Sequence, residues 1–178
     1  MGEHGQTAAA TDHPAAMVLA PALSDRSRWT TERCSIAAVL DVLNTKAAFL
    51  VVRECFYGTR RFDDFVDRVD MSAPAVSRAL KRLEDAGIVA GAPYREPGAR
   101  TRIEYVLTRA GEELLPLVIA LAQWGDAHLR GGEGPLTFTD GASGREVRAV
   151  VTAADADQAL PADAIVVAPG PGARGRTR

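Results

Sequence analysis

The chain has few of the side chains that carry out catalysis or hold metals. Its 178 residues include three histidines and two cysteines, and two cysteines are too few for a disulfide framework. His4 and His13 lie near the amino terminus and His128 at the end of an expected helix, so no histidine accompanies a nucleophile. Phosphate-cradling glycine loops and metal-ligand spacings are also missing from the sequence. We therefore expect a protein that is not an enzyme, with no metal site and no cofactor.

Long apolar runs are missing as well. No stretch of 18 or more apolar residues is present, which predicts that the chain does not span a membrane. The first 33 residues lack the basic start and continuous apolar core of a secretory signal, because AAMVLAPAL is short and contains Pro21. We expect residues 1–33 to form a flexible arm of a cytoplasmic protein with no membrane partner.

The segment DMSAPAVSRALKRLEDAGIV predicts a helix with two distinct faces. Ser72 has a side chain suited to the N-cap, Pro74 suits the first turn, and Gly87 ends the helix. Apolar residues recur at i, i+4 and i+7, namely Val76, Leu80 and Leu83. The opposite side carries the polar residues Ser77, Arg78, Lys81 and Arg82. This arrangement is typical of a recognition helix that enters the DNA major groove, and the alternative is an ordinary solvated surface.

A basic hairpin follows this helix and favours the DNA-binding interpretation. The strand-like runs IVAGAPY and TRIEYVLT flank Pro97-Gly98, which predicts the wing of a winged helix-turn-helix. Between residues 71 and 103, six basic side chains oppose three acidic ones, within a chain of net charge −2. Such focusing of positive charge is expected of a surface that faces phosphates. The residues predicted to contact DNA are Ser72, Ala75, Ser77, Arg78, Lys81, Arg82, Arg95, Arg100 and Arg102.

Four further helices are expected around this motif. They are residues 35–44, residues 46–57, residues 62–69, and a long helix from Arg109 to about Leu129 that Thr108 caps. Pro116 should kink the long helix or mark a displaced start, because it removes one hydrogen bond from the helix. The fold class is therefore mainly α with a small β wing (α+β), with a winged helix-turn-helix domain, a long C-terminal dimerisation helix and an appended C-terminal β segment.

Several motifs in the same order give the chain a family resemblance. They are Cys34 ahead of the first helix, Arg61-Phe62, the segment MSAPAVSRALKRLEDAGIV, the segment IEYVLTRAG and the late helix from Leu114 to Trp124. Over roughly residues 34–129 the chain resembles the HxlR-type winged-helix transcriptional regulators of bacteria. The resemblance implies a homodimer that binds operator DNA.

The late helix carries more apolar surface than one small domain can cover. We expect the surplus to be buried against a second copy, although the helix can also fold back on its own domain. The predicted dimer interface consists of Val39, Leu43, Leu117, Leu121 and Trp124.

After residue 129 the sequence pattern no longer predicts helices. GGEGP suggests a linker, and residues 135–169 predict a small β-rich extension, with PLTFTD and REVRAVVTA as strands joined by GASG and AIVVAP as a third. The extension resembles the tails of some actinobacterial members of the family, but it lacks their paired cysteines. We therefore expect no metal there, but an appended sheet or strand exchange between protomers. The basic residues 170–178 are expected to be disordered.

Two features suggest how DNA binding is controlled. Cys34 stands where the resemblance places a redox-sensing cysteine, at a helix start and beside Arg33, although a packing role is the alternative. Cys55 lies on an apolar helix and is expected to be inert. The family usually has Gly-Lys-Trp at the start of the second helix, where this chain has Ala47 after Lys46. The missing ring can leave a pocket for an apolar effector, can be filled by Trp29 or another side chain, or can be absorbed by a repacked core.

The predicted effector pocket consists of Leu43, Ala47, Phe49, Leu117, Leu121 and Trp124. The predicted function is a sequence-specific, nucleoid-associated, homodimeric DNA-binding regulator controlled by a small apolar or aromatic ligand or by oxidation of Cys34. The alternative is a winged-helix protein-interaction module without specific DNA binding.

Overall fold

The computed structural model describes residues 17–95, 98, 100–154, 160 and 164–168. They divide into two compact units, one from residues 17–29 and the described part of 150–168, the other from residues 30–149. The predicted disordered tail, residues 170–178, and the first part of the predicted arm, residues 1–16, lie outside the described residues.

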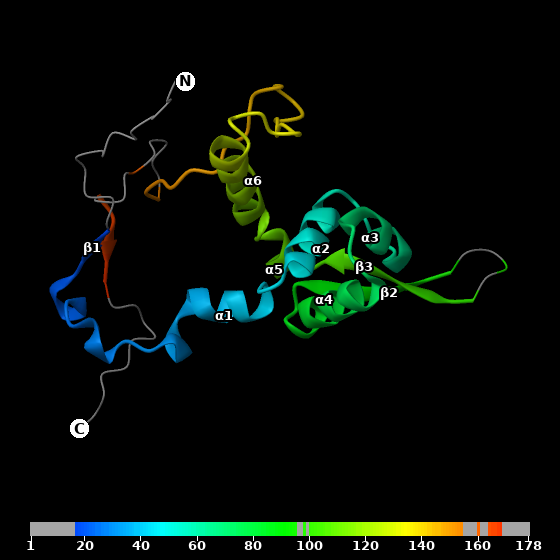
Figure 1. The fold of residues 1–178 in the computed structure, drawn as a ribbon, viewed down its shortest axis with the longest axis horizontal. Coiled ribbons are helices and arrows are strands. Elements are labelled where there is room, and N and C mark those ends of the chain that lie inside the picture. Colours follow the sequence, from blue (N-terminus) through cyan, green and yellow to red (C-terminus); the bar gives the residue numbers. More distant parts are fainter. Residues whose placement is uncertain (1–16, 96–97, 99, 155–159, 161–163, 169–178) are drawn as a thin grey trace, which may run out of the picture. The chain divides into compact units, whose positions relative to one another are not determined.

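The larger unit is built around three helices and a hairpin (Figure 1). Helices α2 (Lys46–Phe56), α3 (Phe62–Val69) and α4 (Ala73–Asp85) precede strands β2 (Val89–Tyr94) and β3 (Arg102–Leu107). The apolar faces of these elements bury one core, in which Phe65, Val76, Leu80 and Leu83 are almost fully excluded from solvent. The predicted bounds of these three helices and of the two wing strands are confirmed to within two residues at each end, and the fold is a winged helix-turn-helix of the α+β class.

Local backbone signals set the ends of these helices. Thr45 caps α2, because its hydroxyl accepts a hydrogen bond from the Ala48 amide at 3.1 Å. Asp70 ends α3 in the left-handed conformation, with a φ of 50°. Ser72 is the N-cap residue of α4 as predicted, but its side chain makes no capping hydrogen bond. Its carbonyl instead accepts hydrogen bonds from the Ala75 and Val76 amides.

The wing is an antiparallel pair with continuous register from Val89 opposite Leu107 to Tyr94 opposite Arg102. The hairpin extends away from the helices (Figure 1). An isolated bridge between Arg61 and Glu104 ties the start of α3 to β3. The Tyr105 amide also donates a hydrogen bond to the Arg60 carbonyl at 2.8 Å, so β3 is anchored on its second edge.

The predicted long helix is divided in two. A short helix, α5 (Arg109–Glu112), starts at Thr108, whose hydroxyl accepts from the Gly111 amide. Helix α6 (Leu115–Leu129) then begins with Pro116 in its first turn. Pro116 therefore marks a displaced start rather than a kink, since a proline at that position breaks no helical hydrogen bond.

The segment after α6 forms a turn rather than the predicted pair of strands. Thr139 and Glu146 form an isolated bridge around a turn, and residues 135–149 contain no further strand pairing. The side chain of Gln123 on α6 provides a physical reason. Its amide donates to the Val147 carbonyl at 2.7 Å and accepts from the Ala149 amide at 3.0 Å, so it binds backbone groups that a neighbouring strand would have used.

The smaller unit contains a contact that the sequence did not predict. Strand β1 (Val18–Leu19) from the expected flexible arm pairs in parallel with β4 (Val166–Val167) from the expected third strand of the extension. The units therefore differ from the predicted boundaries after residues 33 and 129, because β1 and β4 satisfy one another's backbone groups. The short 3-10 helices Pro21–Leu23 and Arg26–Arg28 follow β1.

The larger unit begins with a 3-10 turn, Thr31–Arg33, and helix α1 (Ser35–Val42), which ends two residues earlier than predicted. Within the described residues, no single helix has the length and apolarity to cross a membrane. Taken together, α1 and α2 are long and apolar enough by length and composition alone, but the two helices meet at an angle of 85°.

Candidate nucleic-acid interface

Helix α4 presents one buried and one exposed face. Val76, Leu80 and Leu83 point into the core, as the sequence predicted. Ser77, Arg78, Lys81 and Arg82 are all exposed on the opposite side. The alternation follows from the helical period, because residues three and four apart share a face.

The three basic residues of this face differ in how they are held. Lys81 forms an ion pair with Asp85 one turn later, with 3.0 Å between Nζ and Oδ1, and this hydrogen bond raises the pKa of Lys81 above its usual value. Arg82 donates a hydrogen bond to the side-chain oxygen of Asn44, just ahead of α2. Arg78 makes no hydrogen bond or ion pair with the described residues. Its guanidinium donors therefore remain available to an external acceptor.

The two other predicted contacts on this helix lie at its start. Ser72 is exposed, and its hydroxyl is not used for capping. Ala75 is half-buried and lines a cavity of about 230 Å³ between the start of α2 and α4. Lys46 lines the same cavity and is exposed, so it adds a positive charge beside α4 that the sequence analysis missed. Its place in the first turn of α2, a helix that packs on α4, was the available signal.

The wing supplies the remaining predicted contacts. Arg95, Arg100 and Arg102 are exposed around the end of the hairpin, of which residues 96–97 and 99 lie outside the described part. At the end of β2 nearer the hairpin tip, the guanidinium of Arg61, the N-cap residue of α3, lies 5.0 Å from the centre of the Tyr94 ring. This cation–π contact joins α3 to β2 and helps to orient the hairpin relative to the helices.

The predicted effector pocket does not exist as one site. Ala47 is only 4% exposed and lines the cavity beside α4, because its face of α2 packs on that helix and not on α6. Leu43 is only 2% exposed and belongs to the core. Trp29, proposed as one side chain that fills the space, is itself about half exposed.

A second cavity, of about 310 Å³, contains two of the predicted pocket residues. Phe49 and Leu121 line it together with other side chains of α2, α6 and the segment after α6. Leu117 and Trp124 do not line it. The expectation of a pocket spanning Ala47 and Trp124 was therefore wrong, since α2 directs Ala47 and Phe49 to different neighbours.

Four of the five residues predicted to form the dimer interface are exposed, and the fifth is buried. Val39, Leu117, Leu121 and Trp124 are exposed, with Trp124 at 57%. Leu43 is buried at the C-cap of α1 and cannot contact another chain, which corrects that prediction. The same helices expose further apolar residues that were not predicted, namely Ile36, Leu40 and Leu115.

The two cysteines are in different settings. Cys34 is half-buried at the N-cap of α1, where its carbonyl accepts a hydrogen bond from the Ala38 amide. Burial, with a smaller contribution from the neighbouring Glu54 carboxylate, raises the pKa of the Cys55 thiol to about 12. Cys55 is therefore protonated at neutral pH, which fits its predicted inertness. Among the described residues, no group of three or more His, Cys, Asp or Glu side chains is placed to hold a metal ion.

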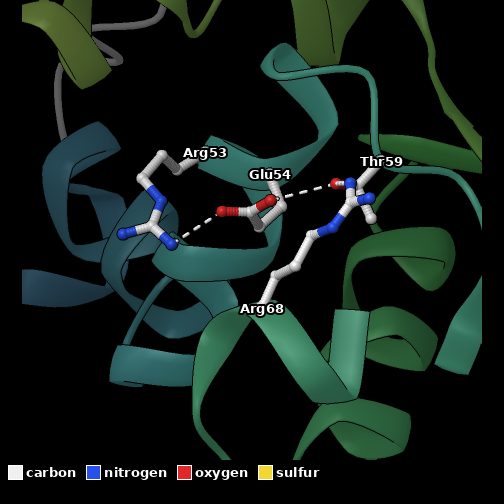
Figure 2. Close-up of polar contacts among 4 residues, drawn as sticks. All are labelled: Arg53, Glu54, Thr59 and Arg68. Carbon is white, nitrogen blue, oxygen red and sulfur yellow. Dashed lines mark hydrogen bonds and ion pairs between the residues drawn. The ribbon is translucent and has the colours of Figure 1, made fainter. Parts of the chain in front are cut away.

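A polar chain in the helix-turn-helix joins α2 to α3 (Figure 2). The Glu54 carboxylate is almost fully buried and accepts a hydrogen bond from Arg53 Nη2 at 2.7 Å. Its second oxygen accepts from the Thr59 hydroxyl at 2.9 Å, and that hydroxyl accepts from Arg68 Nη1 at 2.7 Å. The Arg68 guanidinium of α3 is thus linked through Thr59 to the carboxylate of α2. This chain of hydrogen bonds was not predictable from the sequence, because the apolar pattern of α2 predicted only burial.

Comparisons with known proteins agree with this geometry. A profile of the HxlR-like helix-turn-helix family matches residues 42–133. The HTH-type transcriptional regulator Rv3095 of Mycobacterium tuberculosis, itself uncharacterised, is 34% identical over 101 residues, which cover 57% of this chain and 63% of that protein. The uncharacterised HTH-type regulator sll1512 of Synechocystis is 35% identical over 112 residues, covering 57% of this chain and 82% of the relative.

Two solved structures share the fold. The candidate transcription factor PA1607 superposes with a TM-score of 0.61 at 30% identity, covering 69% of this chain and 86% of that one. PA1374 of Pseudomonas aeruginosa, also a candidate transcription factor, superposes with a TM-score of 0.56 at 30% identity, covering 79% and 95%. The fold and the exposed basic helix thus define a winged-helix transcriptional regulator rather than an enzyme. The chain belongs to the HxlR-like helix-turn-helix family.

Proposed function

We propose that the protein is a homodimeric, sequence-specific DNA-binding regulator that acts in the cytoplasm, on the nucleoid. The observation that carries this proposal is the exposed polar face of α4, with Ser77, Arg78, Lys81 and Arg82 above a buried apolar face. A helix with this division can enter the major groove with its polar face toward the bases, while the rest of the domain rests on the phosphates.

The partners of the basic residues suggest different roles on DNA. Arg78, which makes no hydrogen bond or ion pair with the described residues, is the candidate for a bidentate contact with guanine. Lys81 is paired with Asp85 and fits a phosphate contact better, since it can exchange one anionic partner for another. The exposed wing arginines, Arg95, Arg100 and Arg102, are placed to follow the backbone or enter the minor groove.

The exposed apolar residues of α1 and α6 support a two-fold dimer. Val39, Leu117 and Trp124 are large apolar side chains left uncovered by their own chain. A self-complementary contact through these helices would bury them and place two recognition helices on half-sites about one helical turn apart.

Control by a small apolar or aromatic ligand, or by oxidation of Cys34, completes the proposal. The 310 Å³ cavity supports the first, and the partial exposure of Cys34 at the start of α1 supports the second. Because α1 also carries Val39, a change at Cys34 can act through the dimer contact. The alternative is a protein-interaction module on the same scaffold, which the exposed apolar residues of α1 and α6 would serve.

A binding experiment with selected DNA separates the two functions. An operator sequence would be selected from a random duplex pool and its affinity measured at two salt concentrations. A DNA-binding regulator loses affinity steeply with salt, because Lys and Arg release counterions from the phosphates. Arg78→Ala should weaken specific binding by about 1 to 3 kcal/mol. Arg148→Ala, an exposed arginine paired with Glu146 outside the winged helix, is the matched control and should bind normally. Failure to select any sequence, with affinity insensitive to Arg78→Ala, would favour the protein-interaction module.

A further inference from the structure

The 310 Å³ cavity has the composition of a small-molecule site. It lies between α2, α6 and the segment after α6, and most of its lining is aromatic or aliphatic, including Phe49, Tyr57, Leu121 and Phe138. Only Arg53 and Asp126 contribute charged side chains. An apolar wall with a few polar groups is the usual design of pockets for organic ligands, and the volume falls at the lower end of their range.

Arg53 has hydrogen-bonding capacity that the protein does not use. Its Nη2 donates to Glu54, and its guanidinium lies 5.8 Å from the centre of the Tyr57 ring. Its Nε is buried and has no hydrogen-bond partner among the described residues. Buried donors are rarely left without an acceptor, and the planar guanidinium matches a carboxylate with two parallel hydrogen bonds. Asp126 lines the same cavity and offers an acceptor to a ligand donor.

We propose that this cavity binds a small aromatic acid, with its ring against the aromatic wall, its carboxylate at Arg53 and a hydroxyl or amine substituent at Asp126. The inference rests on the ligand control proposed above and places the effector at this cavity in place of the site expected around Ala47. It also selects among apolar ligands, since a molecule without an acidic group would gain no ion pair with the Arg53 guanidinium.

The polar chain of Figure 2 connects this site to α3, the helix that precedes the recognition helix. A ligand carboxylate competes with Glu54 for the Arg53 guanidinium. Glu54 then depends more on Thr59, whose hydroxyl is also the acceptor for Arg68 of α3. Helix α3 leads through Asp70 and Met71 directly into α4. Ligand binding thus shifts the contact between α2 and α3, and with it the placement of the recognition helix, which links ligand and operator affinity.

The binding test uses the full chain and 4-hydroxybenzoate as probe, with 4-hydroxybenzyl alcohol as its neutral counterpart. Calorimetry should show binding of 4-hydroxybenzoate to the wild-type protein at millimolar or lower concentration. Arg53→Gln should weaken the binding of 4-hydroxybenzoate by about tenfold or more. It should leave the binding of 4-hydroxybenzyl alcohol nearly unchanged, since only the acid interacts with the charge of Arg53. Arg53→Lys keeps the positive charge but not the paired N–H donors of the guanidinium, so its affinity for 4-hydroxybenzoate should lie between those of the wild-type protein and Arg53→Gln. Ala122→Phe should abolish binding of both, because Ala122 lines the cavity and the ring fills it. Arg148→Gln is the matched control.

Several results would overturn the inference. The first is that 4-hydroxybenzoate does not bind the wild-type protein at millimolar concentration. The second is that Arg53→Gln weakens the binding of the acid and of the alcohol equally. The third is that a folded Ala122→Phe variant binds both compounds as the wild-type protein does. Circular dichroism establishes the folding of each variant, and Arg53→Lys keeps the test decisive if Ala122→Phe does not fold. If Ala122→Phe lowers the oligomeric state while the wild-type protein ignores the probe, the cavity receives the partner subunit and not a ligand.

Operator binding is measured separately, so that the two proposals fail separately. With the selected operator, saturating 4-hydroxybenzoate should change the affinity of the wild-type protein by about tenfold in either direction, a coupling within the usual range. The same probe should leave the affinity of Ala122→Phe unchanged. Operator binding without any probe binding would overturn the cavity inference and keep the regulator. Probe binding without operator binding would overturn the proposed DNA-binding function and leave the cavity inference standing.

Discussion

Arg82 on the recognition helix donates a hydrogen bond to Asn44, which lies 38 residues earlier, just before α2. The contact joins the exposed face of α4 to the loop ahead of α2 without using the hydrophobic core. It restrains a long side chain that would otherwise lose rotamer freedom on meeting DNA. Arg82 is thus partly preorganised, and Asn44 acts on DNA binding through Arg82.

Asn44→Ala should weaken operator binding modestly, by about 0.5 to 1.5 kcal/mol, because Arg82 would then pay the full entropic cost of becoming ordered on DNA. The thermal midpoint should change little, since both side chains are exposed. Fluorescence anisotropy with the selected operator measures the effect. In an Arg82→Ala background the Asn44 substitution should have no further effect on affinity, and additive losses would show that Asn44 contacts DNA itself.

Gly111→Ala should destabilise the protein by about 1 to 3 kcal/mol. A methyl group there would lie 2.1 Å from the Ile88 carbonyl oxygen and 2.9 Å from a Leu107 methyl carbon. Helix α5 approaches the base of the wing too closely for any larger residue. Urea unfolding measures the change. Gly125→Ala on α6 is the matched control, because nothing lies within 4 Å of the added methyl, and it should be neutral or slightly stabilising. Equal stability of the two variants would mean that α5 is not packed as described.

The parts of the fold that the sequence predicted are those set by local patterns. The spacing of Val76, Leu80 and Leu83 fixes the inner face of α4, and Pro97-Gly98 between two strand-like runs marks the wing. Thr108 and Pro116 each mark a helix start by their own side-chain chemistry. In each case the cause of the structure lies within a few residues of the signal.

The features that the sequence did not predict depend on contacts between residues that are distant in the chain. The strand-like runs 135–140 and 145–153 predict strands, but their sequences do not show whether a neighbouring strand exists, and here Gln123 binds the backbone groups instead. The pairing of Val18 with Val166 joins a segment that was expected to be a flexible arm to the expected third strand of the extension, almost 150 residues later in the chain. Ala47 illustrates the same limit for the site, because helical spacing shows that it is buried but not whether α4 or α6 covers it.

Oxidation should act through Cys34 and not through Cys55. Burial raises the pKa of Cys55 to about 12, so almost none of it is thiolate at neutral pH, whereas Cys34 is partly exposed at the start of α1. Cys34→Ser should abolish any change in operator affinity on peroxide or quinone treatment, and Cys55→Ser should leave that change intact. The reverse pattern, or a response that survives both substitutions, would remove Cys34 as the sensor.

Cys55 should also make stability fall at alkaline pH. In the unfolded chain the thiol has its ordinary pKa of about 9, and in the folded protein the value is about 12. The protonated form therefore favours folding fully below pH 9, and this contribution is lost as the pH rises from about 9 toward 12. Urea unfolding at a series of pH values in this range measures the loss. Cys55→Ala, though less stable overall, should show a shallower alkaline decline, and an identical slope would mean that Cys55 is not the group responsible.

Charge on the apolar face of α1 and α6 should separate the protomers. Val39→Asp and Leu117→Asp would each place a carboxylate in the proposed interface, where its desolvation strongly opposes association. Light scattering should then give a monomer mass at micromolar concentration, while the wild-type protein gives a dimer. Operator affinity should fall at least about a hundredfold, because each protomer would bind a single half-site without the gain from linkage. Val150→Asp alters an exposed apolar residue outside these helices and should leave both mass and affinity unchanged. A monomeric wild-type protein that still binds the full operator tightly would refute the dimer, and the exposed face of α6 would then need another partner.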